Sequence, residues 1–138
     1  MQQLIFEAAW DKTIAPIDRD NITSLFQKTT NENKKNVEII PISQAINHNE
    51  DLLVIVLIHN FSNEDFPLRN VYASYLEADE LIAEHDFTFP QVNIQRKTSM
   101  PWTFIFPKVS WHRSPSFENS RLQIEKEKKT LQTGKSLQ

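Results

Sequence analysis

The chain has 138 residues, of which 39% are hydrophobic and 24% are charged, and its formal net charge is -3. This length and composition predict one globular domain and exclude collagen-like, coiled-coil and wholly disordered chains. Cysteine is absent and Gly134 is the single glycine, which excludes disulfide scaffolds, thiolate metal sites, P-loops, dinucleotide fingerprints and nucleophile elbows. The mild negative charge also argues against nucleic acid as a partner.

The N-terminal region combines a short apolar run with a helical pattern. Residues 4–10 favour a strand because they are rich in aromatic and β-branched side chains. After Pro16, apolar residues recur at helical spacing over residues 22–26, which predicts one short amphipathic helix capped by Asp18 or Asp20.

Targeting signals are missing from the same region. Glu7 interrupts the first apolar run, and no basic segment precedes it, so the start does not look like a secretory signal. The longest apolar run, residues 52–58, is far shorter than the ~20 residues that span a bilayer. We therefore expect a cytoplasmic protein without an integral membrane segment, whose membrane association would be peripheral or through a partner.

Three apolar segments in the middle of the chain predict strands. Residues 37–42 contain Pro41, which cannot donate to a ladder and indicates a sheet edge or a strand end. Residues 52–58 are continuously aliphatic, as expected of a central strand covered on both faces. Residues 71–76 follow after a turn, and we expect these last two strands to form an antiparallel pair.

Two further segments complete the predicted sheets. Residues 81–89 place alternate apolar side chains on one face, although a helix across residues 75–85 is a competing interpretation. In the next segment Trp102, Phe104 and Phe106 share one face and should anchor the core. Short strands separated by turn residues predict a mainly β fold, an immunoglobulin-like antiparallel β-sandwich with a short N-terminal helix.

Glycine-poor turns and a polar end set two further expectations. Positive φ values should fall to Asn and Asp, which tolerate the left-handed region better than other residues do. From residue 114 onward the chain becomes polar. We therefore place the sandwich domain at residues 1–117 and a polar, flexible C-terminal tail at residues 118–138.

The titratable residues show no pattern typical of a catalytic or metal site. The four histidines are scattered at positions His48, His59, His85 and His112, so no metal or other cofactor is expected. A solvated turn explains the acidic cluster, which consists of Glu77, Asp79, Glu80 and Glu84. A small hydrolase built on His85 and this cluster is a poor alternative, because His85 and Asp86 should point to opposite faces of a strand.

One basic and aromatic patch is a candidate partner-binding site. It comprises Trp111, His112 and Arg113, and Trp and Arg are enriched in the energetically dominant parts of protein interfaces. In the alternative interpretation, which we favour, Trp111 closes the end of the core.

Several segments resemble signatures of the SLAP domain family. Residues 4–11 resemble its opening segment, and residues 100–108, with the sequence Met-Pro-Trp-Thr-Phe-Ile-Phe-Pro-Lys, resemble its closing segment. Residues 52–60 are similar to its central aliphatic strand, and Ala83 followed by Phe87 matches its next alternating segment. The resemblance covers about residues 4–110.

This resemblance implies a function that the composition does not reveal. The family is tied to accessory Sec system S-layer assembly proteins of Gram-positive, Bacillus-type bacteria, and it has no catalytic residues. The resemblance therefore implies a non-enzymatic protein-interaction module that assists export or assembly of surface-layer proteins, with the secretion machinery or a surface-layer precursor as its partner. The alternative is a structural or regulatory β-sandwich of a spore-forming bacterium, unrelated to secretion.

Overall fold

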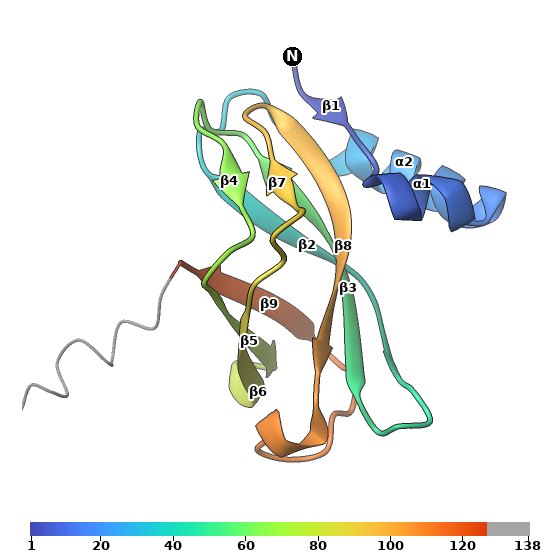
Figure 1. Ribbon diagram of the computed structural model, residues 1–138, viewed down its shortest axis with the longest axis vertical. Coiled ribbons are helices and arrows are strands. Elements are labelled where there is room, and N and C mark those ends of the chain that lie inside the picture. Colours follow the sequence, from blue (N-terminus) through green and yellow to red (C-terminus); the bar gives the residue numbers. More distant parts are fainter. Residues whose placement is uncertain (127–138) are drawn as a thin grey trace, which may run out of the picture.

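Two main β-sheets pack around one hydrophobic core in the computed structural model, which describes residues 1–126 (Figure 1). The larger sheet has the order β1-β8-β3-β2, with bounds Gln3–Leu4, Thr98–Phe106, Leu52–Asn60 and Val37–Ile46. The second has the order β6-β5-β9, with bounds Glu80–Phe87, Val71–Glu77 and Ser120–Glu125. A two-stranded sheet pairs β4 (Phe66–Pro67) with β7 (Asn93–Ile94). The predicted mainly β sandwich is confirmed, with the β1–β8 pair as a parallel exception.

The aliphatic strand β3 lies at the centre of the larger sheet. It pairs antiparallel with β2 on one side and with β8 on the other, as its continuous apolar sequence predicted. Pro41 lies in β2, the edge strand, where the register shifts between Pro41 and Ser43. A proline fits there because a bulge on an edge strand needs no ladder donor.

The predicted pairing of residues 52–58 with residues 71–76 is wrong. The latter segment forms β5, which lies in the other sheet between β6 and β9. Both strands are central strands that contribute buried side chains to the same core cluster, so they face each other instead of exchanging hydrogen bonds. Residues 75–85 form parts of two strands, which excludes the competing helix.

The aromatic side chains of β8 form the middle of the core, as predicted. Phe104 and Phe106 are completely buried, and Trp102 is nearly so. Phe87 from β6 approaches Phe104 and Phe106 edge-on, at centroid distances of 5.2 and 5.3 Å. Edge-to-face contacts of this kind stabilise aromatic clusters beyond the burial of area alone.

The N-terminal region is more helical than the sequence predicted. Only Gln3–Leu4 of the apolar start pairs as a strand, and α1 (Ala8–Thr13) follows, because Glu7 accepts hydrogen bonds from the N–H groups of Ala9 and Trp10. The expected helix is α2 (Pro16–Thr29), but it begins after Ala15 with Pro16 in its first turn. Asp18 and Asp20 therefore lie inside the helix and do not cap it.

The predicted domain end at residue 117 is also wrong. Residues 120–125 form β9, which pairs antiparallel with β5, and Leu122 is buried in the core. Arg121, Gln123 and Glu125 are exposed while Leu122 and Ile124 turn inward, which is the alternation of a half-buried edge strand. The remainder of the predicted tail, residues 127–138, lies outside the described residues.

Backbone positions with positive φ are only partly explained by Asn and Asp. Asn70, Asp79 and Asn119 have positive φ, as expected, but so do four other non-glycine residues, Glu50, Ala78, Lys97 and Phe117. The chain therefore places residues with a Cβ penalty in several of its turns.

Candidate partner-binding surface

The segment that carries Trp111, His112 and Arg113 runs beside the outer edge of β6. It follows a short 3-10 helix, η1 (Lys108–Ser110), and Trp111 forms an isolated antiparallel bridge with Ala83. The backbone N–H of His112 donates to the carbonyl of Ile82 at 2.6 Å. The indole N–H of Trp111 donates to the carbonyl of Phe106 at 3.1 Å, and the ring packs against the core. Trp111 therefore closes the end of the core, as the favoured interpretation predicted.

His112 and Arg113 contact the acidic cluster, which the sequence had placed in a solvated turn. His112 Nε2 lies 2.6 Å from a carboxylate oxygen of Glu84. The Arg113 guanidinium lies 3.0 Å from Glu80 and 3.5 Å from Glu77. The candidate patch and the acidic cluster thus form one charged region beside β6 in the three-stranded sheet.

Glu77 departs most from the expected solvated turn, because only 1% of its surface is exposed. Its carboxylate accepts hydrogen bonds from the Tyr75 hydroxyl, the backbone N–H groups of Ser116 and Phe117, and the Ser116 hydroxyl. Burial alone raises the pKa of this carboxyl, but the bonds from Ser116, Tyr75 and Phe117 outweigh burial and hold the pKa below its ordinary value. Glu77 therefore ties the segment before β9 to the end of β5.

A shallow groove of about 450 Å³ lies next to this charged region. Its lining includes Trp111 and His112 from the candidate patch and the β6 residues Glu84 to Asp86. Val109, which also lines the groove, is 92% exposed. The groove thus joins charged side chains to an exposed aliphatic one, a combination that suits a protein partner better than a small apolar ligand.

The comparisons with known proteins supply one match. The model of the SLAP domain matches residues 4–130, which is most of the chain. The chain belongs to the SLAP domain family. No curated protein and no solved structure matches the chain.

The family match covers more of the chain than the resemblance seen in the sequence, which covered about residues 4–110. The match to the SLAP domain includes β9, so this strand is part of the domain that the family model describes. The name of the family model places the chain among accessory Sec and S-layer-related domains. Among residues 1–126, no helix is long and apolar enough to cross a membrane.

Sequence reasoning missed a buried polar network in this SLAP domain. His59 and Ser99 are both fully buried, and His59 Nδ1 lies 2.6 Å from the Ser99 hydroxyl. On the other side of the ring, Nε2 lies 2.7 Å from the Thr29 hydroxyl of α2, which itself donates to the carbonyl of Leu25. The Thr29 hydroxyl therefore accepts from His59 Nε2–H, and Nδ1 of an uncharged ring accepts from the Ser99 hydroxyl. The ring is neutral in this arrangement.

This network joins the N-terminal segment and α2 to the larger sheet. Gln2 donates from Nε2 to the Ser99 hydroxyl and to the carbonyl of Asn60, both at 3.1 Å. Burial lowers the pKa of the His59 imidazole, and the charge of Glu38 opposes this only in part. In the sequence, the sign of this network is His59 directly after the apolar residues 52–58. A histidine at such a position indicates a buried imidazole whose nitrogens are hydrogen-bonded.

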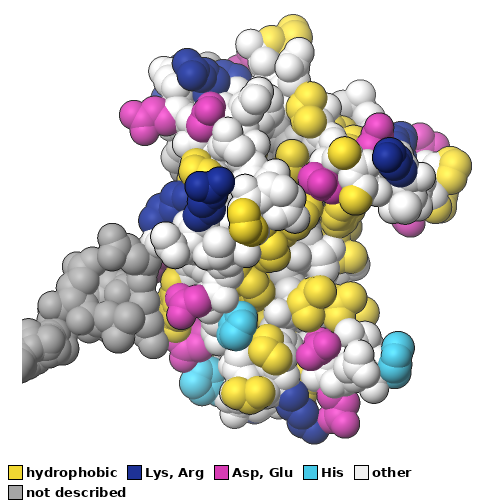
Figure 2. Space-filling view, viewed as in Figure 1, with side chains coloured by type: hydrophobic (Ala, Val, Ile, Leu, Met, Phe, Trp, Pro, Cys, Tyr) yellow, Lys and Arg dark blue, Asp and Glu magenta, His cyan; other side chains and the backbone are white. Residues whose placement is uncertain are grey.

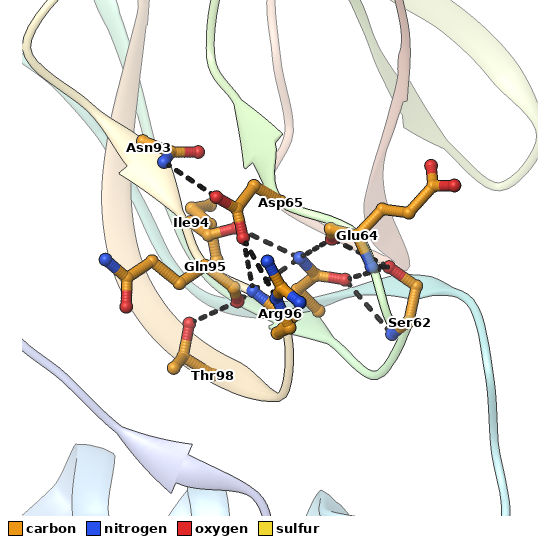
Figure 3. Close-up of polar contacts among 9 residues, drawn as sticks. Ser62, Glu64, Asp65, Asn93, Ile94, Gln95, Arg96 and Thr98 are labelled. Atoms are coloured by element: carbon orange, nitrogen blue, oxygen red, sulfur yellow. Dashed lines mark hydrogen bonds and ion pairs between the residues drawn. The ribbon is translucent and has the colours of Figure 1, made fainter.

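Asn60, the last residue of β3, forms a second group of polar contacts next to His59. Its side-chain N–H₂ donates to the carbonyls of Glu64, Ile94 and Gln95, and its oxygen accepts from the backbone and hydroxyl of Ser62. Figure 3 shows a second set of polar contacts in this region, in which the Asp65 carboxylate accepts from the Asn93 side chain and the Arg96 backbone N–H and lies near the Arg96 guanidinium. Asn60 therefore fixes two loops against each other.

Proposed function

We propose that this chain is a non-enzymatic protein-interaction module that assists accessory secretion or assembly of surface-layer proteins in a Bacillus-type bacterium. The observation that carries the proposal is the match of the SLAP domain model to residues 4–130. The module would act at the cytoplasmic side of the secretion route and bind either the secretion machinery or a surface-layer precursor.

The roles of the polar side chains support binding over catalysis. His112, Glu84 and Arg113 are engaged in pairs that hold loops to the sheet. The His59–Ser99 pair has the residue types of a base and a nucleophile, but both residues are 0% exposed. A nucleophile must reach its substrate, so this pair is better explained as a structural link between α2 and the sheet.

The groove beside Trp111 offers one surface for such a partner. Val109 is the side chain there that a partner could bury, since it is almost fully exposed. Val109→Asp should reduce capture of the partner without unfolding the protein, because the residue makes few contacts that folding depends on. Gln27→Asp, at an exposed position of α2, is the matched control.

Affinity capture with the full chain from its own cells tests the proposal. Recovery of translocase subunits or surface-layer precursors, confirmed by reciprocal capture, is the expected result. Reproducible recovery of other partners alone would favour a structural or regulatory role unrelated to secretion. Turnover on a panel of hydrolase substrates, lost in His85→Ala, would overturn the non-enzymatic assignment.

A further inference from the structure

The outer face of the larger sheet, on the side away from the core, is only partly covered. Helices α1 and α2 lie beside one end of this sheet, and no other α-helix of residues 1–126 covers the remainder (Figure 1). In the uncovered part, two rows of paired residues run across β2, β3 and β8, and none is charged: Ala45, Leu53 and Ile105 in one row, and Ser43, Ile55 and Thr103 in the other. Ile105 is 47% exposed. The sheet thus presents an uncharged, largely apolar face to solvent.

A groove of about 480 Å³ leads from this face to the helices. Each neighbouring layer contributes apolar side chains to it: Trp10 from α1 and Ile14 directly after that helix, Ile22 from α2, and Ile42 and Ile55 from the sheet. In Figure 2, hydrophobic side chains gather on the surface below the two helices. The groove and the uncharged rows therefore form one surface, which we call the helix–sheet groove.

One charge lies at the helix side of this groove. Asp18 of α2 is the charged residue of its lining, and it takes part in none of the ion pairs formed among residues 1–126. By contrast, Asp11 of α1 pairs with Arg19 at 2.7 Å. An apolar groove with a carboxylate at one end is complementary to an apolar segment with a cation at one end.

The dimensions of the surface select a helix as the occupant. Three strands are about 10 Å wide between the outer two, and two rows of side chains on one face are about 7 Å apart. This area matches one side of an α-helix, whose diameter is about 10 Å. An extended segment would instead pair with a sheet edge, because the backbone groups of a sheet face are already bonded.

We propose that the helix–sheet groove binds an apolar helical segment that carries a lysine or arginine at one end, with the basic residue beside Asp18. A basic start followed by a short apolar run is the general chemistry of the segments that open exported proteins. The assignment of the segment to an export precursor rests on the proposed function, whereas the groove's preference for this chemistry does not.

Binding of a synthetic peptide to the full chain tests the preference. The probe is a helical peptide of about 15 residues, built of Leu and Ala with Lys at its first two positions. The comparison peptide has Glu at these two positions. Both peptides have this length because it gives about four helical turns. The Lys peptide should bind more tightly, as measured by calorimetry. Ile105→Lys should weaken it by about tenfold or more, since it places a charge in the apolar floor. Gln27→Lys, at an exposed position of α2 outside the groove lining, should leave it unchanged.

A pair of neighbouring carboxylates isolates the charge effect. Asp18→Asn should weaken binding of the Lys peptide by about two- to fivefold at low salt, and Asp20→Asn, on the same helix but outside the groove, should leave it unchanged. Asp18→Lys should reverse the preference toward the Glu peptide. Equal losses for both Asn variants, or no reversal, would overturn the role of Asp18.

Other occupants give distinct results. Concentration-dependent dimerisation that Ile105→Lys abolishes, without binding of either peptide, would show a second copy in the groove and overturn the proposal. Binding to anionic phospholipid vesicles that depends on Ile105, again without peptide binding, would also overturn it. If secretion partners are captured but neither peptide binds, the groove proposal fails while the proposed function stands. If the Lys peptide binds but no secretion partner is captured, the proposed function fails while the groove proposal stands.

Discussion

Glu77 and Glu80 lie at the two ends of one tight turn and contact the same arginine, yet their surroundings differ completely. Glu77 is buried and accepts hydrogen bonds from three residues, whereas Glu80 is exposed. A buried carboxylate contributes through the bonds that hold it, while an exposed ion pair contributes little. The sequence shows both residues simply as members of an acidic turn.

Replacement of Glu77 should therefore destabilise the fold much more than replacement of Glu80. Glu77→Gln should cost about 2 to 4 kcal/mol of unfolding free energy at pH 7, since the amide cannot accept at all the positions that the carboxylate does. Urea denaturation measures the loss. Glu80→Gln is the control, and an equal loss in both variants would contradict the role of Glu77.

The pH dependence of Glu77 has a definite sign. Its folded pKa lies below the ordinary value of 4.5, so its contribution is complete above that value and is lost as the pH falls through the folded pKa. Denaturation curves between pH 3 and 6 should therefore lose less stability on acidification in Glu77→Gln than in the unaltered protein. Parallel pH profiles would contradict this assignment.

Protonation of His59 should favour the unfolded chain at mildly acidic pH. Its folded pKa is lowered from 6.5, so the unfolded chain binds more protons than the folded one once the pH falls below that value. The unfolding free energy should then decrease between pH 7 and 5, and His59→Gln should reduce this slope while the exposed-loop control His48→Gln keeps it. Imidazole ¹⁵N shifts should show the proton on Nε2; a proton on Nδ1 would contradict the network.

At the scale of elements, the β5–β6 hairpin contains a costly turn. Its strand ends pair Glu77 with Glu80, and both intervening residues, Ala78 and Asp79, have positive φ. A two-residue turn with two positive φ values normally contains Asn and Gly, because other residues clash there. The turn therefore has a steric cost at Ala78, where the Cβ atom clashes with the backbone at positive φ.

Ala78→Gly should stabilise the protein by about 0.5 to 1 kcal/mol, because it removes the Cβ clash at positive φ. Thermal and urea denaturation should both register the gain. Ala73→Gly, in the interior of β5, should instead destabilise the protein, and a loss in Ala78→Gly as well would contradict the strain at this turn.

Strand β9 should be required for folding. Without residues 120–126, β5 loses one of its two partners and the core loses Leu122. A chain that ends at Asn119 should therefore unfold or aggregate, whereas a chain that ends at Lys126 should keep the melting temperature of the full chain. Circular dichroism distinguishes the two, and a folded 1–119 chain would show that β9 only covers an edge.

The elements differ in how well their sequences determine them. Strands β3 and β8 were predictable because the local order of apolar side chains produces their burial. The partners of β5 were not, because an apolar strand carries no local record of which sheet it joins. In β9 the period-two pattern was present, but only Leu122 and Ile124 are apolar, so the pattern is short and weak. The contacts of Trp111 with the core were predicted, whereas the pairing of Arg113 with Glu77 depends on distant segments meeting.

At the scale of the whole molecule, one core serves both sheets. Its members come from β3, β5, β6, β7, β8 and β9 and from the loop positions Leu68 and Val92. An aromatic contact connects α1 to it through Trp10 and Trp102, whose ring centroids are 6.5 Å apart. Among residues 1–126, no three His, Asp or Glu side chains gather as they would around a metal ion.

Chelation should consequently leave the melting temperature unchanged. A structural metal contributes directly to the free energy of folding, so its removal would lower the melting temperature by several degrees. Differential scanning calorimetry with and without EDTA makes the comparison, with added magnesium and calcium as the reciprocal condition. A fall in EDTA that zinc restores would contradict this expectation.

The pairing of β1 with β8 and of β5 with β9 joins segments that are far apart along the chain, as the register of Gln3 with Thr98 shows. Contacts of this kind form late, because a long loop must close before they bring any gain, and folds rich in them take milliseconds to seconds to form. The β5–β6 hairpin can form first, since its strands are adjacent. Until residues 120–125 have been synthesised, the other edge of β5 stays unpaired and open to aggregation or to a chaperone. The last strand to be synthesised in this sheet is therefore the one that closes the free edge of β5.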